Sequence, residues 1–434
     1  MKRALFITCL FSVQTMAGSG ANSGSALTTG PSSSHYSLYA GSSNPAMGSL
    51  LISEDDSSRI TYLPSVSFGF EIGEVDNFAD DLDELIELLD DPGSITEPQG
   101  DVLDRFNLIL EEMGEAGYIK NTVAVNAPLF PMYIRSERFG GYFGADISAG
   151  LDTAVRILDA ELRADPIQGF QTNTSIYLKS GINTTFGLSY SRDVWSRKEA
   201  GGRENTLYAG AKFKVINMDL SKQVIWLESL DGKDVGDVIS DEYDTNLNSS
   251  TGIALDIGFV WDADWYRAGL TLENINSPSF SYGAVGVDCV SRGEDNPERS
   301  ACDVAQFFIA QGRIKAGESH TMHALVQVDG LVQVTDRWHV SSTLDLAEYD
   351  DVVGFSNQWF HLATSYESRG FWLPSARVGY HTNLAGTKLS SMNFGLTFFK
   401  VLSLDVEWGL ESIEVDGSTA PQLFGFAIGF EEKF

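Results

Sequence analysis

The chain has 434 residues, of which 43% are hydrophobic and 11% aromatic, a composition too apolar for a disordered protein. Its formal net charge of −31 argues against nucleic-acid binding and against attachment to anionic lipid through basic patches. No run of 18 apolar residues follows the N-terminus, which excludes helical membrane spans but not a membrane protein built from alternating strands.

The N-terminus has the pattern of a secretory signal peptide. Lys2 and Arg3 precede a short apolar stretch, and a small-x-small exit predicts cleavage after Ala17. The alternative is a buried N-terminal strand. Residues 18–35 are rich in Gly, Ser and Thr, which predicts a flexible lead-in to the mature chain.

An acidic helical insertion is predicted over residues 76–117. Its first half places Phe78, Leu82 and Leu85 on one face, and a second amphipathic stretch follows between Val102 and Met113. The two stretches predict a solvated helical hairpin. An acidic docking surface is the alternative interpretation.

From about Phe139 to the C-terminus, apolar residues recur at every second position. Residues 402–410 show the pattern, since Leu404, Val406 and Trp408 alternate with polar residues or glycine. This period of two predicts antiparallel β-strands with one apolar face. The runs after Phe139 predict about fourteen strands, and two earlier runs, 63–72 and 120–126, would raise the number to sixteen.

Two all-β architectures fit such strands: a soluble sandwich with an apolar core, and a membrane barrel with an apolar outer face. The predicted connections alternate between short and long, as the short periplasmic turns and long outer loops of an outer-membrane barrel do. The short connections are expected near residues 216–217, 262–264, 335–337 and 400. The long ones are expected at 192–204, 228–249, 274–320, 347–356, 382–390 and 411–422.

Aromatic residues at the predicted strand ends favour the same architecture, because aromatic rings gather at both membrane interfaces. Trp261, Trp265 and Trp338 would lie at the short-turn end, with Trp195 and Trp408 toward the long-loop end. The chain also ends in an alternating aromatic strand that contains Phe430 and finishes on Phe434, which is typical of the signal read by the outer-membrane assembly machinery. We therefore expect an all-β, antiparallel transmembrane barrel in the bacterial outer membrane, exported through the secretory pathway.

The polar positions of the strands would then line the lumen. The candidates are Arg267, Glu273, His339, Asp345, Arg377, His381, Asp405 and Glu407. Such charges either pair across the lumen and stiffen the wall or select solutes in a polar channel.

Cys289 and Cys302 lie in one polar stretch of the mature chain. In an exported protein such a pair predicts a disulfide that closes a surface loop. The alternatives are two free thiols or a metal site, although a zinc site would want four ligands.

Catalytic and metal-binding motifs are absent from the sequence. Six histidines occur without a His-Glu-x-x-His pattern, and neither a Gly-x-Ser-x-Gly elbow nor a P-loop is present. The acidic residues of 231–244 could hold calcium, but their spacing is not that of an EF-hand loop, and a solvated loop is expected. We expect no enzyme activity, no cofactor and no metal.

Near the start of the mature chain, Asn44-Pro45-Ala46 precedes the strand-like run Leu63-Pro64-Ser65-Val66. This order resembles that of FadL-like outer-membrane proteins, where an N-terminal stretch plugs the barrel. More closely, the progression through an acidic helical segment to a terminal Phe resembles the TraF-like plasmid-transfer family of that barrel group. The resemblance implies a plug that contains Asn44, Pro45 and Ala46, together with a link by family name to conjugal transfer. The long insertion with the cysteine pair, 274–320, departs from the pattern.

The expected organisation is a signal peptide over 1–17, a lead-in and plug over 18–60, and a barrel over 61–434 that carries the long surface loop 274–320. The expected function is non-catalytic: transport of small or hydrophobic solutes, or envelope support. The alternative is a barrel that serves as a platform for a partner, without solute passage. The expected partners are outer-membrane lipid, the barrel assembly machinery and either a hydrophobic ligand or an envelope protein; we expect a monomer that binds no nucleic acid.

Overall fold

The computed structural model describes residues 24–31, 37–52, 56–90, 98–165, 169–198, 204–230, 246–292, 297–415 and 417–430. The predicted signal peptide, the acidic run 231–244 and Phe434 lie outside the described residues.

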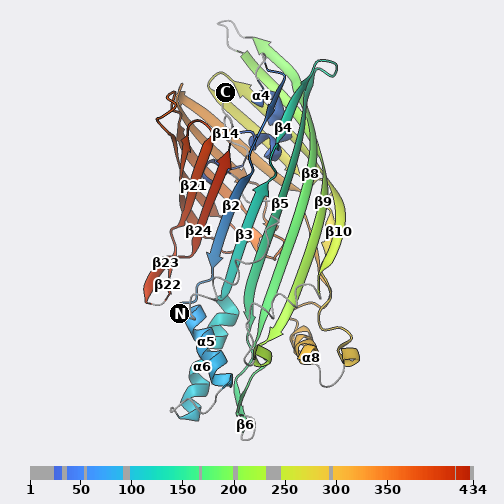
Figure 1. The fold of residues 1–434 in the computed structure, drawn as a ribbon, viewed down its shortest axis with the longest axis vertical. Helices are drawn as coiled ribbons and strands as arrows, with labels where there is room; N and C mark the ends of the chain where they lie inside the picture. Colours follow the sequence, from blue (N-terminus) through green and yellow to red (C-terminus); the bar gives the residue numbers. More distant parts are fainter. Residues whose placement is uncertain are drawn as a thin grey trace.

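Fourteen antiparallel strands form a closed ring around one lumen (Figure 1). In chain order they are β2 (Ser65–Ile72), β3 (Tyr118–Asn126), β5 (Gly141–Leu158), β8 (Ser175–Lys198), β9 (Glu204–Trp226), β10 (Asn248–Ala263), β11 (Tyr266–Glu273), β14 (Leu325–Thr335), β15 (Trp338–Asp345), β18 (Trp359–Tyr366), β19 (Ser375–Asn383), β20 (Ser390–Phe398), β21 (Leu402–Gly409) and β24 (Leu423–Phe430). Each strand pairs with the next, and β24 closes the ring on β2. The predicted all-β antiparallel barrel is confirmed.

The sequence predicted about fourteen strands after Phe139. In the structure, two of the fourteen ring strands, β2 and β3, precede that residue. A short turn was predicted at Ile216-Asn217, and this prediction is wrong: β9 runs through both residues without a break. The sequence pattern changes phase there for a physical reason. Before residue 216 the apolar side chains, such as Phe213, face outward, whereas afterwards Ile216 and Met218 face inward against the loops that fill the barrel mouth.

Two additional strands extend the sheet beside the ring. β4 (Met132–Ser136) pairs with the part of β5 that β3 does not cover, so β3 and β4 occupy successive positions along one edge of β5. β1 (Ser58–Ile60) pairs with β4, which adds part of the predicted lead-in to the wall. Residues 127–131, which include a cis peptide bond before Pro131, separate β3 from β4.

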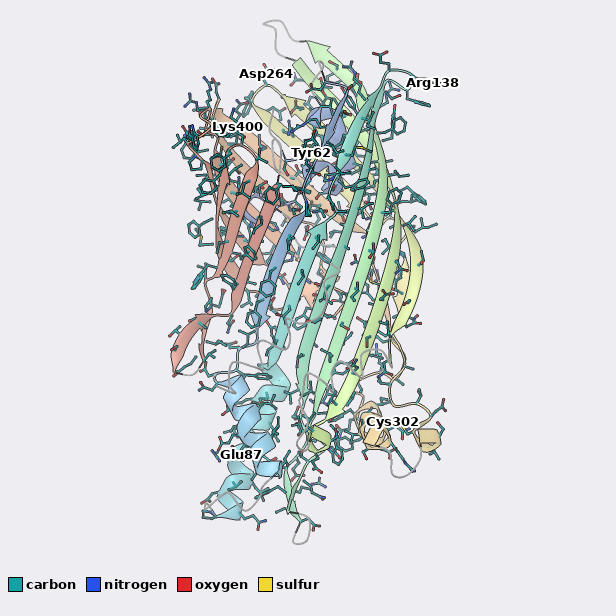
Figure 2. The ribbon with its side chains drawn as sticks, viewed as in Figure 1. Tyr62, Glu87, Arg138, Asp264, Cys302 and Lys400 are labelled. Atoms are coloured by element: carbon teal, nitrogen blue, oxygen red, sulfur yellow. A yellow bond between two sulfur atoms is a disulfide. The ribbon has the colours of Figure 1, made fainter. Side chains whose placement is uncertain are left out.

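The two ends of the barrel differ strongly in their connections. Figure 2 shows Arg138, Asp264 and Lys400, each in a tight connection, at one end, whereas Glu87 and Cys302 lie at the other end in long excursions. The predicted long connection at 192–204 is wrong, because β8 continues to Lys198 and β9 begins at Glu204. Consequently Trp195 lies at the short-turn end, where its ring stacks on that of Trp261 at 5.3 Å between centroids.

The outer surface of the ring is apolar and is edged by aromatic residues. On β21, Leu404 and Trp408 are 39% and 52% exposed, whereas Asp405 between them is 1% exposed. Further aromatic pairs lie near the short turns, among them Trp338 with Tyr366 at 5.2 Å between centroids. An apolar outer face, a polar interior and aromatic edges are features of a barrel in a lipid bilayer, so the chain has an outer-membrane β-barrel fold. Among the described residues, no helix is long and apolar enough to cross a membrane.

The long-loop end carries helices and pairs of short strands. They are α5 (Phe78–Asp90), α6 (Gln99–Ala116), η2 (Leu227–Leu230), η3 (Cys289–Arg292) and α8 (Pro297–Ala310), with the paired short strands β6 (Arg163–Asp165) and β7 (Gly169–Gln171), β12 (Ser279–Ser281) and β13 (Ser319–Thr321), β16 (Tyr349–Asp350) and β17 (Ser356–Asn357), and β22 (Ser412–Val415) and β23 (Ser418–Pro421). The apolar faces of α5 and α6 bury Leu85, Phe106 and Met113 against Ile157 and Ile225 of the wall strands. This packing fixes the acidic hairpin beside the ends of β5 and β9.

Candidate functional site: the lumen, the N-terminal segment and the cavity

The inward faces of the strands carry the residues that alternation predicted for the lumen. Seven of the eight candidates are buried and Glu273 is half-buried. Four of them line the large internal cavity described below: Glu273, Asp345, His381 and Glu407. The other four, Arg267, His339, Arg377 and Asp405, lie in the wall outside that cavity. The structure therefore divides the predicted set between two parts of the lumen.

In the short-turn half, the charged side chains pair with one another. Arg377 Nη2 lies 2.8 Å from Asp405 Oδ2, and the same guanidinium donates to the Thr397 hydroxyl at 2.6 Å. Arg267 Nε donates to Asp262 at 2.9 Å. Paired and hydrogen-bonded charges of this kind stiffen the wall and leave little net charge to act on a solute.

The N-terminal segment, residues 24–31 and 37–52, occupies the short-turn half of the lumen. It folds into four short helical turns, α2 (Ala26–Thr29), α3 (Ala40–Ser43), η1 (Pro45–Met47) and α4 (Gly48–Leu51), and nearly all its described residues are buried. Figure 1 shows α4 inside the ring near the short turns. Small and hydroxylated residues suit this position, because the surrounding wall is polar and leaves little room.

Residues Leu27 and Thr28 fasten the segment to one side of the wall. Asn393 Nδ2 donates to the Leu27 carbonyl oxygen at 2.7 Å, and His381 Nε2 lies 3.2 Å from the Thr28 carbonyl oxygen. The Thr28 hydroxyl donates to Asp405, the carboxylate that also pairs with Arg377. Two predicted lumen residues, His381 and Asp405, therefore hold the N-terminal segment in place.

Asn44-Pro45-Ala46 fastens the segment to the opposite side, on β9 and β10. The Asn44 side-chain oxygen accepts from Ala46 N at 3.0 Å, and its amide nitrogen donates to the Phe259 carbonyl oxygen at 3.4 Å. A Cβ at Gly258 would overlap the Asn44 side chain, and one at Gly210 would overlap the Pro45 backbone. The wall thus needs glycine at both positions to let the turn approach so closely.

A cavity of about 430 Å³ lies beyond the N-terminal segment, toward the long-loop end. Leu27, Tyr39 and Ser42 of the segment form part of its lining, together with inward-facing residues of the wall strands and residues of the loop around Asp351. The volume lies within the range of small-molecule sites. The arrangement can hold a small solute between the N-terminal segment and the loops.

The loops at the long-loop end roof the cavity. Asp351 accepts from Lys120 Nζ at 2.7 Å. Burial alone would raise the pKa of Asp351, but this ammonium, together with hydrogen bonds from Phe355 and Asn357, holds the pKa below its ordinary value. Phe280, Val353 and Phe355 pack with Ile216 in one buried cluster. Part of the predicted surface loop 274–320 is therefore buried in the barrel mouth.

The paired strands β12 and β13 of the roof carry a half-buried histidine, and an ion pair lies beside them. Burial lowers the pKa of His320 from 6.5 to about 4, so the ring is neutral at neutral pH. Glu318 accepts from Lys179 Nζ at 2.7 Å, and although burial would raise the pKa of Glu318, this ammonium keeps it below its ordinary value. The roof is thus tied to β8 by a charge pair.

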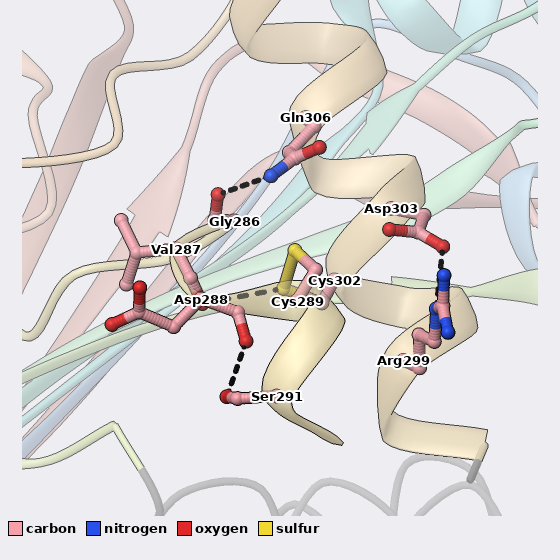
Figure 3. The surroundings of a disulfide bond; sticks show 9 residues. All are labelled: Gly286, Val287, Asp288, Cys289, Ser291, Arg299, Cys302, Asp303 and Gln306. Carbon is pink, nitrogen blue, oxygen red and sulfur yellow. Dashed lines mark hydrogen bonds and ion pairs between the residues drawn. A yellow bond between two sulfur atoms is a disulfide. The ribbon is translucent and has the colours of Figure 1, made fainter. Parts of the chain in front are cut away.

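Cys289 and Cys302 are joined by a disulfide in the outer part of the 274–320 loop, away from the cavity (Figures 2 and 3). It links η3 to α8, and Gln306 Nε2 of the same helix donates to the Gly286 carbonyl oxygen at 3.1 Å. Phe308 of α8 packs on Val224 of β9. The pair closes a loop on the outside of the barrel and takes no part in the lumen.

At the predicted assembly signal, Phe430 ends β24 with its ring on the half-exposed outer face, where its backbone pairs with Leu402. Phe434 lies outside the described residues.

Sequence reasoning missed several charged residues of the cavity wall. Glu71, Lys120, Asp146, Asp152 and Asp256 all line the cavity. The signal was present, because Asp146 and Asp152 stand at even positions of β5 while Ile147 and Leu151 stand at odd ones. For β2 and β3, the short runs before Phe139 had to be recognised as wall strands first.

The family described as "F plasmid transfer operon, TraF, protein" matches residues 42–345. No curated protein matches.

Three solved structures to which the chain is similar are a FadL homologue and two toluene transporters. A Pseudomonas aeruginosa FadL homologue is 12% identical with a TM-score of 0.39, over 97% of this chain and 99% of that one. The Pseudomonas putida toluene transporter TodX is 13% identical with a TM-score of 0.40, over 96% and 98%. The Ralstonia pickettii toluene transporter TbuX is 12% identical with a TM-score of 0.42, over 95% and 98%. The fold assignment itself rests on the strand pairing of this chain. By the family match, which spans more than half of its length, the chain belongs to the TraF family of the F plasmid transfer operon.

Proposed function

We propose that this protein passes a small solute across the bacterial outer membrane through its lumen, that the N-terminal segment acts as a movable plug, and that no catalysis takes place. The observation that carries the proposal is the position of that segment, which fills one half of the lumen and borders a cavity in the other half. A stretch that only completed the wall would not need to lie across the path.

The plug is held by contacts that can be broken without unfolding the ring. Its attachment to the ring includes hydrogen bonds to Asn393, His381 and Asp405 on one side. On the other side it includes hydrogen bonds to Phe259, Ser191 and Lys212, together with the apolar packing of Met47 on Val260. Single hydrogen bonds contribute about 1 kcal/mol each to stability. The wall, by contrast, is a closed ladder of backbone hydrogen bonds between fourteen strands.

The chemistry of the cavity favours a hydrophilic solute over a hydrophobic one. Carboxylates and lysines from the strands line it, and burying an apolar molecule against charged groups would cost their hydration. The lumen charges serve as pairing partners and as a lining, which supports a non-catalytic role.

The sequence and the fold support a setting in the outer membrane. The signal-peptide pattern supports export through the secretory pathway, and the aromatic end strand supports insertion by the barrel assembly machinery. The short turns would face the periplasm and the helices the outside. Because a single chain closes the ring, a monomer suffices.

The test is flux of a small hydrophilic solute into liposomes that carry the refolded protein. Deleting residues 24–52 should raise the flux strongly above that of the full chain. Barrel integrity is checked by circular dichroism and by the heat-dependent shift of folded barrels on gels. A folded deletion variant with no more flux than the full chain would contradict the proposed plug.

The alternative function is a platform for an envelope partner, without solute passage. The α5–α6 hairpin favours it, since this hairpin extends beyond the strand ends and carries exposed acidic residues such as Glu84 and Glu87 (Figure 1). Under this alternative, removing residues 76–117 should lower plasmid transfer between cells, while folded barrels with and without residues 24–52 remain equally impermeable.

A further inference from the structure

The cavity lining carries an excess of negative charge. Its lysines are each paired with a carboxylate: Lys120 with Asp351 at 2.7 Å, Lys212 with Asp146 at 2.8 Å, and Lys214 with Asp256 at 2.8 Å. Further carboxylates line the same space without such a partner. Within the described residues, no lysine or arginine nitrogen lies within 4 Å of Glu71, Asp152, Glu273 or Asp345.

These carboxylates are arranged in two sectors of the wall. Glu71 of β2 and Asp152 of β5 lie on either side of β3. Glu273 of β11 and Asp345 of β15 lie on either side of β14, and β8, β9 and β10 separate the two sectors along the ring. Because neighbouring strands lie about 4.8 Å apart, one small ion could not contact both sectors at once.

Unsatisfied polar atoms face the same cavity, and they are independent of the carboxylates. Within the described part of the chain, His361 Nδ1 and the hydroxyls of Ser67 and Thr185 have no hydrogen-bond partner, although all three residues are at least nine-tenths buried. A buried polar group without a partner costs about 1–3 kcal/mol. Groups of this kind are satisfied when a ligand with hydrogen-bonding groups enters.

Aromatic rings complete the lining. Tyr39, Tyr349 and Trp359 face the cavity, and the faces of such rings attract organic cations. Their presence distinguishes a site for an organic cation from a purely carboxylate site for a metal ion.

We propose that the cavity binds a small organic cation with two or more amino groups, one group reaching Glu71 and Asp152 and another reaching Glu273 and Asp345. The amino groups donate hydrogen bonds to the carboxylates and to the free hydroxyls, and the carbon chain between them spans the lumen. This inference names the solute class for the proposed passage and rests on that function.

The test is isothermal titration calorimetry of the detergent-solubilised full chain with spermidine, and with sorbitol as a neutral molecule of similar size. Spermidine should bind, sorbitol should not, and the affinity should fall as salt is added. Asp152→Asn and Glu273→Gln, one from each sector, should each weaken binding about tenfold, since each removes a charge-assisted contact. Glu87→Gln, on the exposed face of α5, is the matched control and should leave binding unchanged.

The plug could keep spermidine out of the cavity of the full chain. The titration is therefore repeated with Gly258→Val, because the valine side chain displaces the Asn44 turn. Absence of spermidine binding in both the full chain and this folded variant would overturn the inference, and so would binding that neither carboxylate substitution weakens. The result is separable from the proposed passage: if a neutral solute crosses the opened barrel but spermidine does not bind, the passage stands and the cation site fails.

Discussion

The two halves of the lumen differ in how their buried polar and charged groups are paired. In the short-turn half, polar groups bond to polar groups: Arg377 pairs with Asp405, and Asn393 donates to the backbone carbonyl oxygen of Leu27. In the long-loop half, a cavity remains, with unpaired carboxylates and with hydroxyls that lack partners. The first half is built for rigidity. In the second half, carboxylates and hydroxyls remain available to bind a ligand.

The comparison predicts unequal costs for removing charges in the two halves. Arg377→Met would leave Asp405 buried without its cation, and losing one partner of a buried pair costs about 3–5 kcal/mol. Asp152→Asn in the cavity half should change stability far less, because Asp152 has no such partner. Unfolding by guanidinium chloride, followed by tryptophan fluorescence in detergent, measures both.

Equal losses from the two substitutions would remove the distinction between the halves. The double variant Arg377→Met with Asp405→Leu is the control, and it should recover much of the stability because no isolated charge remains.

The disulfide sharpens the comparison by separating the outer loop from the barrel. Cys289→Ser with Cys302→Ser removes a link between residues 13 apart, a loop length for which about 3 kcal/mol of local stabilisation is expected. Because the pair lies outside the lumen, this loss should appear as faster proteolysis within residues 274–320. The guanidinium midpoint of the barrel should stay the same. A fall in that midpoint would show that the loop supports the wall.

The smallest expected effect is a loss of stability of the roof at acidic pH. His320 has its pKa lowered to about 4 in the folded state against an ordinary 6.5, so neutral His320 favours the folded roof. This contribution is fully present above pH 6.5 and is lost progressively as the pH falls toward 4. Protease access to the paired strands β12 and β13 should therefore increase over that interval.

His320→Gln should flatten this pH dependence, because glutamine does not titrate. The loss below pH 4.5 should remain in the variant, since Glu318 has a depressed pKa and stabilises the roof until it is protonated. An unchanged profile between pH 6.5 and 4 in the variant would show that another group titrates there.

The barrel and many of its lumen residues could be predicted from the sequence alone. An apolar residue at every second position is what a wall with lipid outside and polar groups inside requires. The same rule led to the wrong prediction of a turn at Ile216-Asn217. There β9 continues as one strand, but its apolar side chains move to the inner face, where they pack against the loops of the barrel mouth.

The plug contacts and the cavity could be predicted only in outline. The resemblance of Asn44-Pro45-Ala46 pointed to a plug, but its seat on Gly258 and Gly210 joins residues more than 160 positions apart, which no local pattern reveals. Whether a lumen carboxylate is paired depends on the closure of the ring. For this reason Asp405 and Asp345 looked alike in the sequence and have different surroundings in the fold.

The most direct test of the account is ion conductance of single barrels in planar bilayers, compared between the full chain, Gly258→Val and Gly330→Val. At Gly258 the new side chain overlaps Asn44 and should displace the plug, whereas at Gly330 a Cβ meets its nearest neighbour only at 3.8 Å. The proposed plug predicts a closed full chain, a conducting Gly258→Val variant and a closed Gly330→Val variant. Equal conductance of all three folded barrels would contradict it.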